Sequence, residues 1–117
     1  MIKYRNFEKT YIIAEIGVNH DGSLESAINL VNLAQESGAD AVKFQTFTSQ
    51  DLARRSTPKV KYQTETTPKD LSHFEMLKKL ELSKSDFIDI KKHCSNIGIR
   101  FISTPYSISA VDLLEDI

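Results

Sequence analysis

The chain has 117 residues, of which 40% are hydrophobic and 26% charged, as is usual for a single soluble globular domain. Its 15 basic and 16 acidic residues give a formal net charge of −1, which offers neither the basic excess of a nucleic-acid-binding protein nor an acidic tail. Its one cysteine, Cys94, excludes an internal disulfide and a cysteine-based metal cage, and fits a reducing, cytoplasmic location.

The first half of the chain has the patterns of a strand, a helix and a second strand. Residues 11–16 are almost continuously apolar, which predicts a parallel strand buried on both faces. Ser23 is placed as the N-cap of a helix that carries apolar residues at helical spacing and ends at Gly38. Residues 41–47 form the second predicted strand.

The second half begins with a long polar insert, residues 48–70, which has no predicted structure. Ser72 and Ser83 each begin a capping box, so that two helices are expected in succession. Residues 99–104 form a third strand, and a last helix starts near Ser109. No run has the length of a membrane span. This alternation predicts an α/β fold with three βα units and a parallel sheet.

Polar side chains occupy positions inside the predicted strands. Lys43 and Gln45 share one face of the second strand, while their neighbours on the other face are apolar. Glu15 and Thr104 lie near the C-terminal ends of the first and third strands. Because ligands of parallel α/β proteins bind at that edge, these four side chains are expected to converge on a binding site.

The residue types indicate the chemistry of such a site. A lysine and a threonine suit a phosphate or carboxylate, a glutamine adds a neutral hydrogen-bonding group, and a carboxylate can handle protons. An alternative is that Glu15 and Lys43 form a buried structural ion pair, which would not prevent them from lining a site.

The remaining candidates receive plainer interpretations. Asn19 and His20 fall in the loop after the first strand, where local hydrogen bonding at the rim is expected of His20. His93 neighbours two lysines on a helix face that is predicted to be solvated, and it is given no chemical role. Cys94 lies on an apolar helical stripe and is predicted to be a core residue.

Four segments resemble, in the same order, the N-acetylneuraminate (sialic acid) synthase family. They are residues 11–24 (YIIAEIGVNHDGSL), 38–47 (GADAVKFQTF), 74–83 (FEMLKKLELS) and 101–107 (FISTPYS). The family includes synthases of sialic, legionaminic and pseudaminic acids, and residues 15–20 look closer to the sialic and legionaminic branches.

The resemblance implies a TIM (β/α)8 barrel, of which this chain would be the N-terminal portion, holding the first three βα units. The remaining strands and an antifreeze-like C-terminal domain would be absent from it. The full enzyme would be a cytoplasmic homodimer, a transferase of carbohydrate biosynthesis. It would condense phosphoenolpyruvate with N-acetylmannosamine or a related N-acetylated sugar to a nonulosonic acid, releasing phosphate.

The resemblance also implies roles for individual residues. Lys43 and Thr104 would hold phosphoenolpyruvate, Gln45 would face the sugar or the reacting centre, and Glu15 would handle a proton or orient a partner. Asn19 and His20 would stand at the rim of the substrate site. A divalent metal, Mn²⁺ or Mg²⁺, would polarise the sugar aldehyde, but its ligands are expected beyond Ile117, so this chain would hold no metal ligand.

Two other functions remain open at this point. One is a barrel that makes keto-deoxy sugar acid phosphates from a phosphorylated aldehyde. The other is a non-catalytic truncated fragment, since three βα units alone are expected to be inactive and marginally stable. The insert, residues 48–70, either folds over the sugar or is a mobile surface loop.

Overall fold

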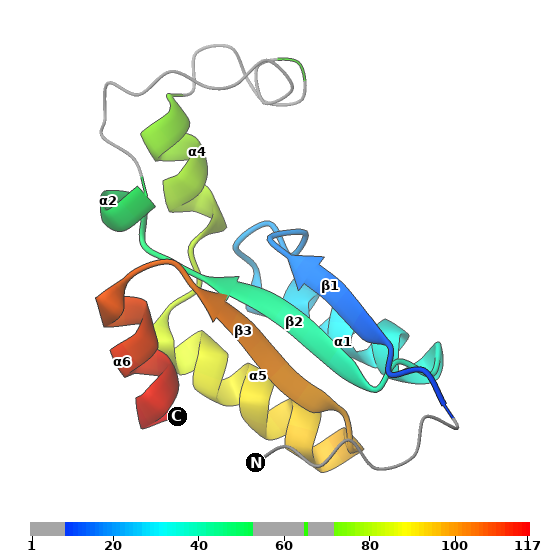
Figure 1. Ribbon diagram of the computed structural model, residues 1–117. Coiled ribbons are helices and arrows are strands. Elements are labelled where there is room, and N and C mark those ends of the chain that lie inside the picture. Colours follow the sequence, from blue (N-terminus) through cyan, green and yellow to red (C-terminus); the bar gives the residue numbers. More distant parts are fainter. Residues whose placement is uncertain (1–8, 53–64, 66–71) are drawn as a thin grey trace.

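The computed structural model describes residues 9–52, 65 and 72–117, and these form a parallel sheet backed by helices (Figure 1). The strands lie in the order β1-β2-β3, and both pairs are parallel. The predicted α/β class and parallel sheet are therefore confirmed. In chain order the elements are β1 (Ile13–Gly17), α1 (Leu24–Glu36), β2 (Ala41–Thr46), α2 (Ser49–Leu52), α4 (His73–Leu80), α5 (Lys84–Ile97), β3 (Arg100–Pro105) and α6 (Ile108–Asp116).

The helices begin and end where the capping residues predict. The Ser23 side chain accepts a hydrogen bond from the first turn of α1, and complete capping boxes at Ser72 and Ser83 begin α4 and α5. Gly98 ends α5 with φ 78°, a left-handed conformation that costs glycine little. Ser107 caps α6 one residue before Ile108, close to the predicted start.

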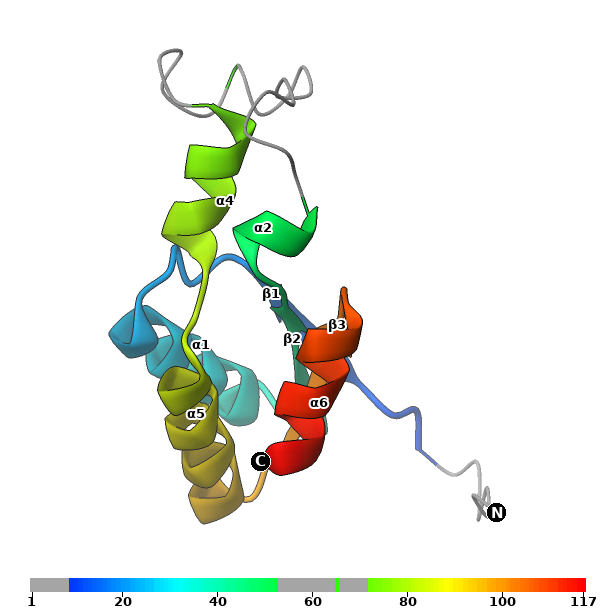
Figure 2. The same cartoon turned by 90° about the vertical axis from the view of Figure 1, so that its left-hand side faces the viewer.

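Helices cover one face of the sheet. In Figure 2, α1 and α5 lie together on one side of the strands, and Phe44 of β2 is fully buried beneath them. The Phe44 ring packs 6.4 Å from Phe87 and 5.7 Å from Phe101, between centroids. Cys94 belongs to the same apolar cluster, and burial raises the pKa of its thiol to about 11, so it is the predicted core residue and no nucleophile.

The opposite face of the sheet is open, and the predicted burial of the first strand on both faces is wrong. The side of β1 away from the helices leaves Ile13 47% exposed, and Ile12 just before the strand is 49% exposed. In the described ranges β1 pairs only with β2, and no element packs on this face. The apolar run of residues 11–16 gives this face of the sheet a surface suited to burial, and no element of the described ranges covers it.

A second, smaller core joins α4 to the C-terminal end of the sheet, and α2 packs against α4. Phe47, Met76 and Leu77 form this core, with Val18 and Leu80 packed against them. As a result, α2 and α4 stand beyond the C-terminal ends of the strands (Figure 1). The predicted unstructured insert therefore contains a helix, α2, at its start; Glu65 is also helical, and the rest of the insert lies outside the described residues.

Glu81 fastens α2 to the junction between α4 and α5. Its carboxylate accepts hydrogen bonds from the backbone N–H and the hydroxyl of Ser49, which is fully buried, and pairs with Lys78 at 2.8 Å. Burial by itself would raise the pKa of Glu81, but the bonds from Lys78 and Ser49 together outweigh it and leave the pKa below its ordinary value.

This geometry predicts a pH-dependent loss of stability on replacing Glu81 with glutamine. We expect a cost of about 1–3 kcal/mol at neutral pH, because the ionised carboxylate accepts two hydrogen bonds from Ser49 and one from Lys78. The pKa is lower in the folded state, so the contribution is present above the ordinary glutamate pKa and fades as the pH falls through the folded value. Urea unfolding of both proteins from pH 7 to pH 3 measures this, and a pH-independent difference would contradict it.

None of the helices in the described ranges combines the length and the apolar sequence that a membrane crossing requires.

Candidate functional site

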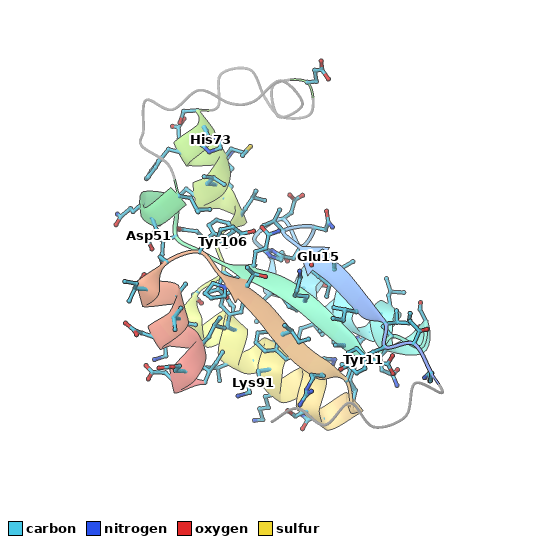
Figure 3. All side chains as sticks on the ribbon, in the orientation of Figure 1. Tyr11, Glu15, Asp51, His73, Lys91 and Tyr106 are labelled. Carbon is cyan, nitrogen blue, oxygen red and sulfur yellow. The ribbon has the colours of Figure 1, made fainter. Side chains whose placement is uncertain are left out.

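The polar strand residues gather on the open face of the sheet. Register places Glu15 of β1 opposite Lys43 of β2, and Gln45 of β2 opposite Thr104 of β3. All four therefore stand on the same side, away from the helices, toward the C-terminal ends of the strands. Figure 3 shows the Glu15 side chain near the end of β1. The sheet thus brings together the four strand residues that the sequence predicts to share a site.

Glu15 and Lys43 form an ion pair, with 2.9 Å between Lys43 Nζ and Glu15 Oε2. The alternative of an ion pair is confirmed, but the pair is not buried: the two side chains are 47% and 37% exposed. Ion pairs with this exposure contribute about 0–1 kcal/mol to stability. The ammonium group is therefore oriented by Glu15 while remaining open to a ligand.

Gly17 is a site residue whose importance sequence reasoning missed. A Cβ built on it would lie 3.4 Å from both Gln45 Nε2 and Glu15 Oε1. Its φ is 56°, and the pairing register of β1 with β2 shifts between Glu15 and Gly17. A Cβ at 3.4 Å would be in ordinary contact with the carboxylate and the amide, so the positive φ is what favours glycine at the end of β1. The only signal in the sequence was a glycine directly after an apolar strand.

The turn after β1, residues 17–23, places Asn19 and His20 differently. Asn19 is exposed and lines, together with Glu15, a groove of about 350 Å³ between β1 and α1, to which Leu30, Leu33 and Ala34 of α1 also contribute. His20 is only 1% exposed, and its ring stacks at 6.1 Å on Phe44, whose side chain points away from Lys43 and Gln45. The predicted local hydrogen bond of His20 is confirmed, but its ring does not lie at the open rim.

His20 is held as a neutral imidazole. Its Nδ1 accepts a hydrogen bond from the Gly22 N–H at 3.0 Å, so the proton of the neutral ring is on Nε2. Nε2 is buried and makes no hydrogen bond of normal geometry to the described part of the chain. Burial lowers the pKa of His20, and the charges of Asp21 and Asp86 and the Gly17 carbonyl offset only part of this.

Another hollow in the described part of the chain lies away from this face. This hollow of about 500 Å³, between the α4–α5 junction and α6, contains none of the predicted site residues. No group of three or more histidine, cysteine, aspartate or glutamate side chains in the described ranges is arranged to hold a metal ion.

Comparison with known families decides what this arrangement belongs to. The NeuB family matches residues 30–117, which include β2, β3 and all the helices except the first turns of α1. The chain belongs to the NeuB family.

Individual NeuB relatives extend the match over the whole chain. The N,N'-diacetyllegionaminic acid synthase of Legionella pneumophila is 45% identical over 97% of this chain and 32% of its own length. The human N-acetylneuraminate-9-phosphate synthase is 30% identical over 92% of this chain and 30% of its own length. The chain thus spans about a third of the length of the curated relatives it matches.

Solved structures agree with this NeuB assignment. A sialic acid synthetase from Leptospira borgpetersenii, crystallised with citrate, superposes with a TM-score of 0.70 at 26% identity, covering 91% of this chain and 32% of that one. The spore coat polysaccharide biosynthesis protein of Bacillus subtilis gives a TM-score of 0.65 at 31% identity, covering 95% and 28%.

Proposed function

We propose that this chain is the N-terminal part of a nonulosonic acid synthase. The enzyme would condense phosphoenolpyruvate with N-acetylmannosamine or a related N-acetylated sugar and release phosphate. The observation that carries the proposal is the cluster of Lys43, Glu15, Gln45 and Thr104 on one open sheet face, in a NeuB chain whose relatives are synthases of such acids.

The cluster offers groups for both substrates of the proposed reaction. Lys43 Nζ and the Thr104 hydroxyl offer donors to the phosphate or carboxylate of phosphoenolpyruvate. Gln45, beside Thr104 in register, faces the sugar or the reacting centre. Glu15 holds the ammonium of Lys43 and can accept or donate a proton within the same cluster.

The bonds that change follow from the two substrates. Carbon 3 of phosphoenolpyruvate forms a bond with the aldehyde carbon of the open-chain sugar, and the aldehyde oxygen takes up a proton. Water adds at carbon 2, and the bond between carbon 2 and the phosphate oxygen breaks. The products are a 2-keto acid, lengthened by three carbons relative to the sugar, and inorganic phosphate.

The proposal extends to parts of the enzyme outside this chain. The three strands would be the start of a TIM (β/α)8 barrel, whose ligand site lies at the C-terminal ends of its strands. A homodimer, a cytoplasmic location and a divalent metal, Mn²⁺ or Mg²⁺, belong to the same proposal, with the metal ligands on later residues. The open face of the sheet supports it, since further strands would cover that face.

The experiment begins with the polypeptide made from the native gene, whose intact mass establishes its length. We expect phosphate release from phosphoenolpyruvate with N-acetylmannosamine or another N-acetylated sugar, and none with arabinose 5-phosphate. Activity with the phosphorylated aldehyde alone would favour a keto-deoxy sugar acid phosphate synthase. A native product that ends at Ile117 and turns over nothing would favour the non-catalytic fragment.

A further inference from the structure

We infer that His20 is a positioning residue, which fixes the turn of residues 17–23 so that Asn19 meets the N-acetylated sugar. The inference rests on the proposed function, because it assigns Asn19 to the sugar side of that site. It gives His20 a role through the backbone in place of a direct contact with substrate.

The turn has a backbone shape that needs support. Three of its residues have positive φ: Gly17 at 56°, Asp21 at 55° and Gly22 at 72°. Aspartate in this region is strained, and such conformations persist where the surroundings hold them in place. Within the turn, backbone bonds run from Asn19 N–H to the Ile16 carbonyl at 3.0 Å and from Asp21 N–H to the Val18 carbonyl at 3.1 Å.

His20 supplies two further bonds from inside the turn. Its ring Nδ1 accepts from the Gly22 N–H at 3.0 Å, and its backbone carbonyl accepts from the N–H of Ser23, the N-cap of α1, also at 3.0 Å. The ring is anchored in turn by stacking on Phe44. Phe44 stands between Lys43 and Gln45 in β2, so the ring links the turn to the strand that carries two of the proposed substrate contacts.

The choice of histidine is itself informative. Among the described residues the buried Nε2–H has no hydrogen bond of normal geometry, which costs stability, and a phenylalanine would fill the same space without that cost. What histidine adds at this position is an acceptor for the Gly22 N–H. The geometry therefore identifies the Nδ1 bond, and not packing alone, as what the side chain contributes.

Asn19 is the residue whose position the His20 ring would fix. It precedes His20 directly, is exposed, and lies in the turn that follows the C-terminal end of β1, the edge of a parallel sheet at which ligands bind. A loosened turn would displace Asn19, whereas Lys43 and Thr104 are held by the strands. Loss of the Nδ1 bond is therefore expected to weaken sugar binding selectively and to leave phosphoenolpyruvate binding nearly unchanged.

The test compares three variants in the polypeptide made from the native gene. His20→Phe keeps the ring and loses the acceptor, and we expect the KM for the sugar to rise about tenfold or more while the KM for phosphoenolpyruvate changes less than about twofold. His20→Asn returns an acceptor oxygen near the position of Nδ1 and should recover part of the loss. His93→Phe removes a histidine that bonds Asn32 at 2.7 Å, far from the turn, and should leave both KM values unchanged.

A spectroscopic measurement keeps this inference separate from the proposed function. In wild-type protein labelled with ¹⁵N-histidine, the ring nitrogen shifts of His20 should report a neutral ring with the proton on Nε2. A proton on Nδ1, or a folded His20→Phe variant with an unchanged KM for the sugar, would overturn the role of His20 alone. A wild-type enzyme that neither binds nor turns over any N-acetylated sugar would overturn the proposed function, and the sugar contact of Asn19 with it.

Discussion

Replacing Lys43 with methionine is expected to lower kcat/KM for phosphoenolpyruvate by at least about 100-fold in the polypeptide made from the native gene. A charge-assisted hydrogen bond to a phosphate or carboxylate is worth about 1.5–3 kcal/mol, which corresponds to roughly 10- to 150-fold. In the wild type, Glu15 Oε2 lies 2.9 Å from Lys43 Nζ. The variant leaves this carboxylate without its cation, and its repulsion of the anionic substrate adds to the loss. Steady-state kinetics with varied phosphoenolpyruvate measures the effect.

Two further variants show whether Lys43 binds substrate or only neutralises Glu15. The control Lys84→Met removes a lysine of similar exposure, which pairs with Asp116 on the helix side, and should change kcat/KM less than about twofold. The double variant Glu15→Gln, Lys43→Met removes both charges. If it regained most of the wild-type activity, the ion pair would be structural and the proposed contact of Lys43 with phosphoenolpyruvate would be wrong.

Replacing Gly22 with alanine is expected to destabilise the protein by about 2–5 kcal/mol. The new Cβ would lie 1.9 Å from the Lys79 carbonyl oxygen at the end of α4, and a backbone atom cannot yield as a flexible side chain does. The left-handed backbone, with φ 72°, contributes about 1–2 kcal/mol, and the forced shift of the turn or of α4 about 1–3 kcal/mol more.

Gly38→Ala is the matched control for this prediction. Gly38 also has positive φ, at 83°, but a Cβ there meets nothing within 4 Å. Its replacement should cost only the backbone contribution of about 1–2 kcal/mol. Urea unfolding of both variants gives the difference between their free energies of unfolding, provided that this free energy falls equally steeply with urea concentration in the two variants. Equal losses would mean that the close approach of the turn to α4 contributes nothing to stability.

Local rules placed most of the fold correctly from the sequence. Ser23, Ser72 and Ser83 each accept a hydrogen bond from a free N–H group in the first turn of a helix. Because the donor lies only three residues further along the chain, these caps could be predicted from the local sequence, and they are where they were predicted. The polar face of the strands was predicted for the same reason, since alternation along a strand is a local property. Register then aligned Glu15 with Lys43 and Gln45 with Thr104.

The predictions that failed depended on contacts with distant segments. His93 was placed on a solvated face because lysines precede it, yet α1 packs against that part of α5 and Asn32 bonds its ring. The ring of His20 was placed at the rim, yet Phe44, 24 positions further along the sequence, covers it. Gly17 was not singled out from the sequence, because its closeness to the Gln45 amide becomes visible only when β1 and β2 are paired. Each error concerns a contact between residues that are far apart in the sequence.

The bond between Glu81 and Ser49 bears on how members of the NeuB family can differ from one another. It joins the start of α2 to the end of α4, and these two helices pack against each other. The connection that leaves α2 therefore returns to a neighbour already held in place. Because lengthening such a connection costs only about 0.6 kcal/mol for each doubling, residues 53–71 are a natural graft point. Segments of different length and sequence could be exchanged there between relatives without rebuilding the sheet below.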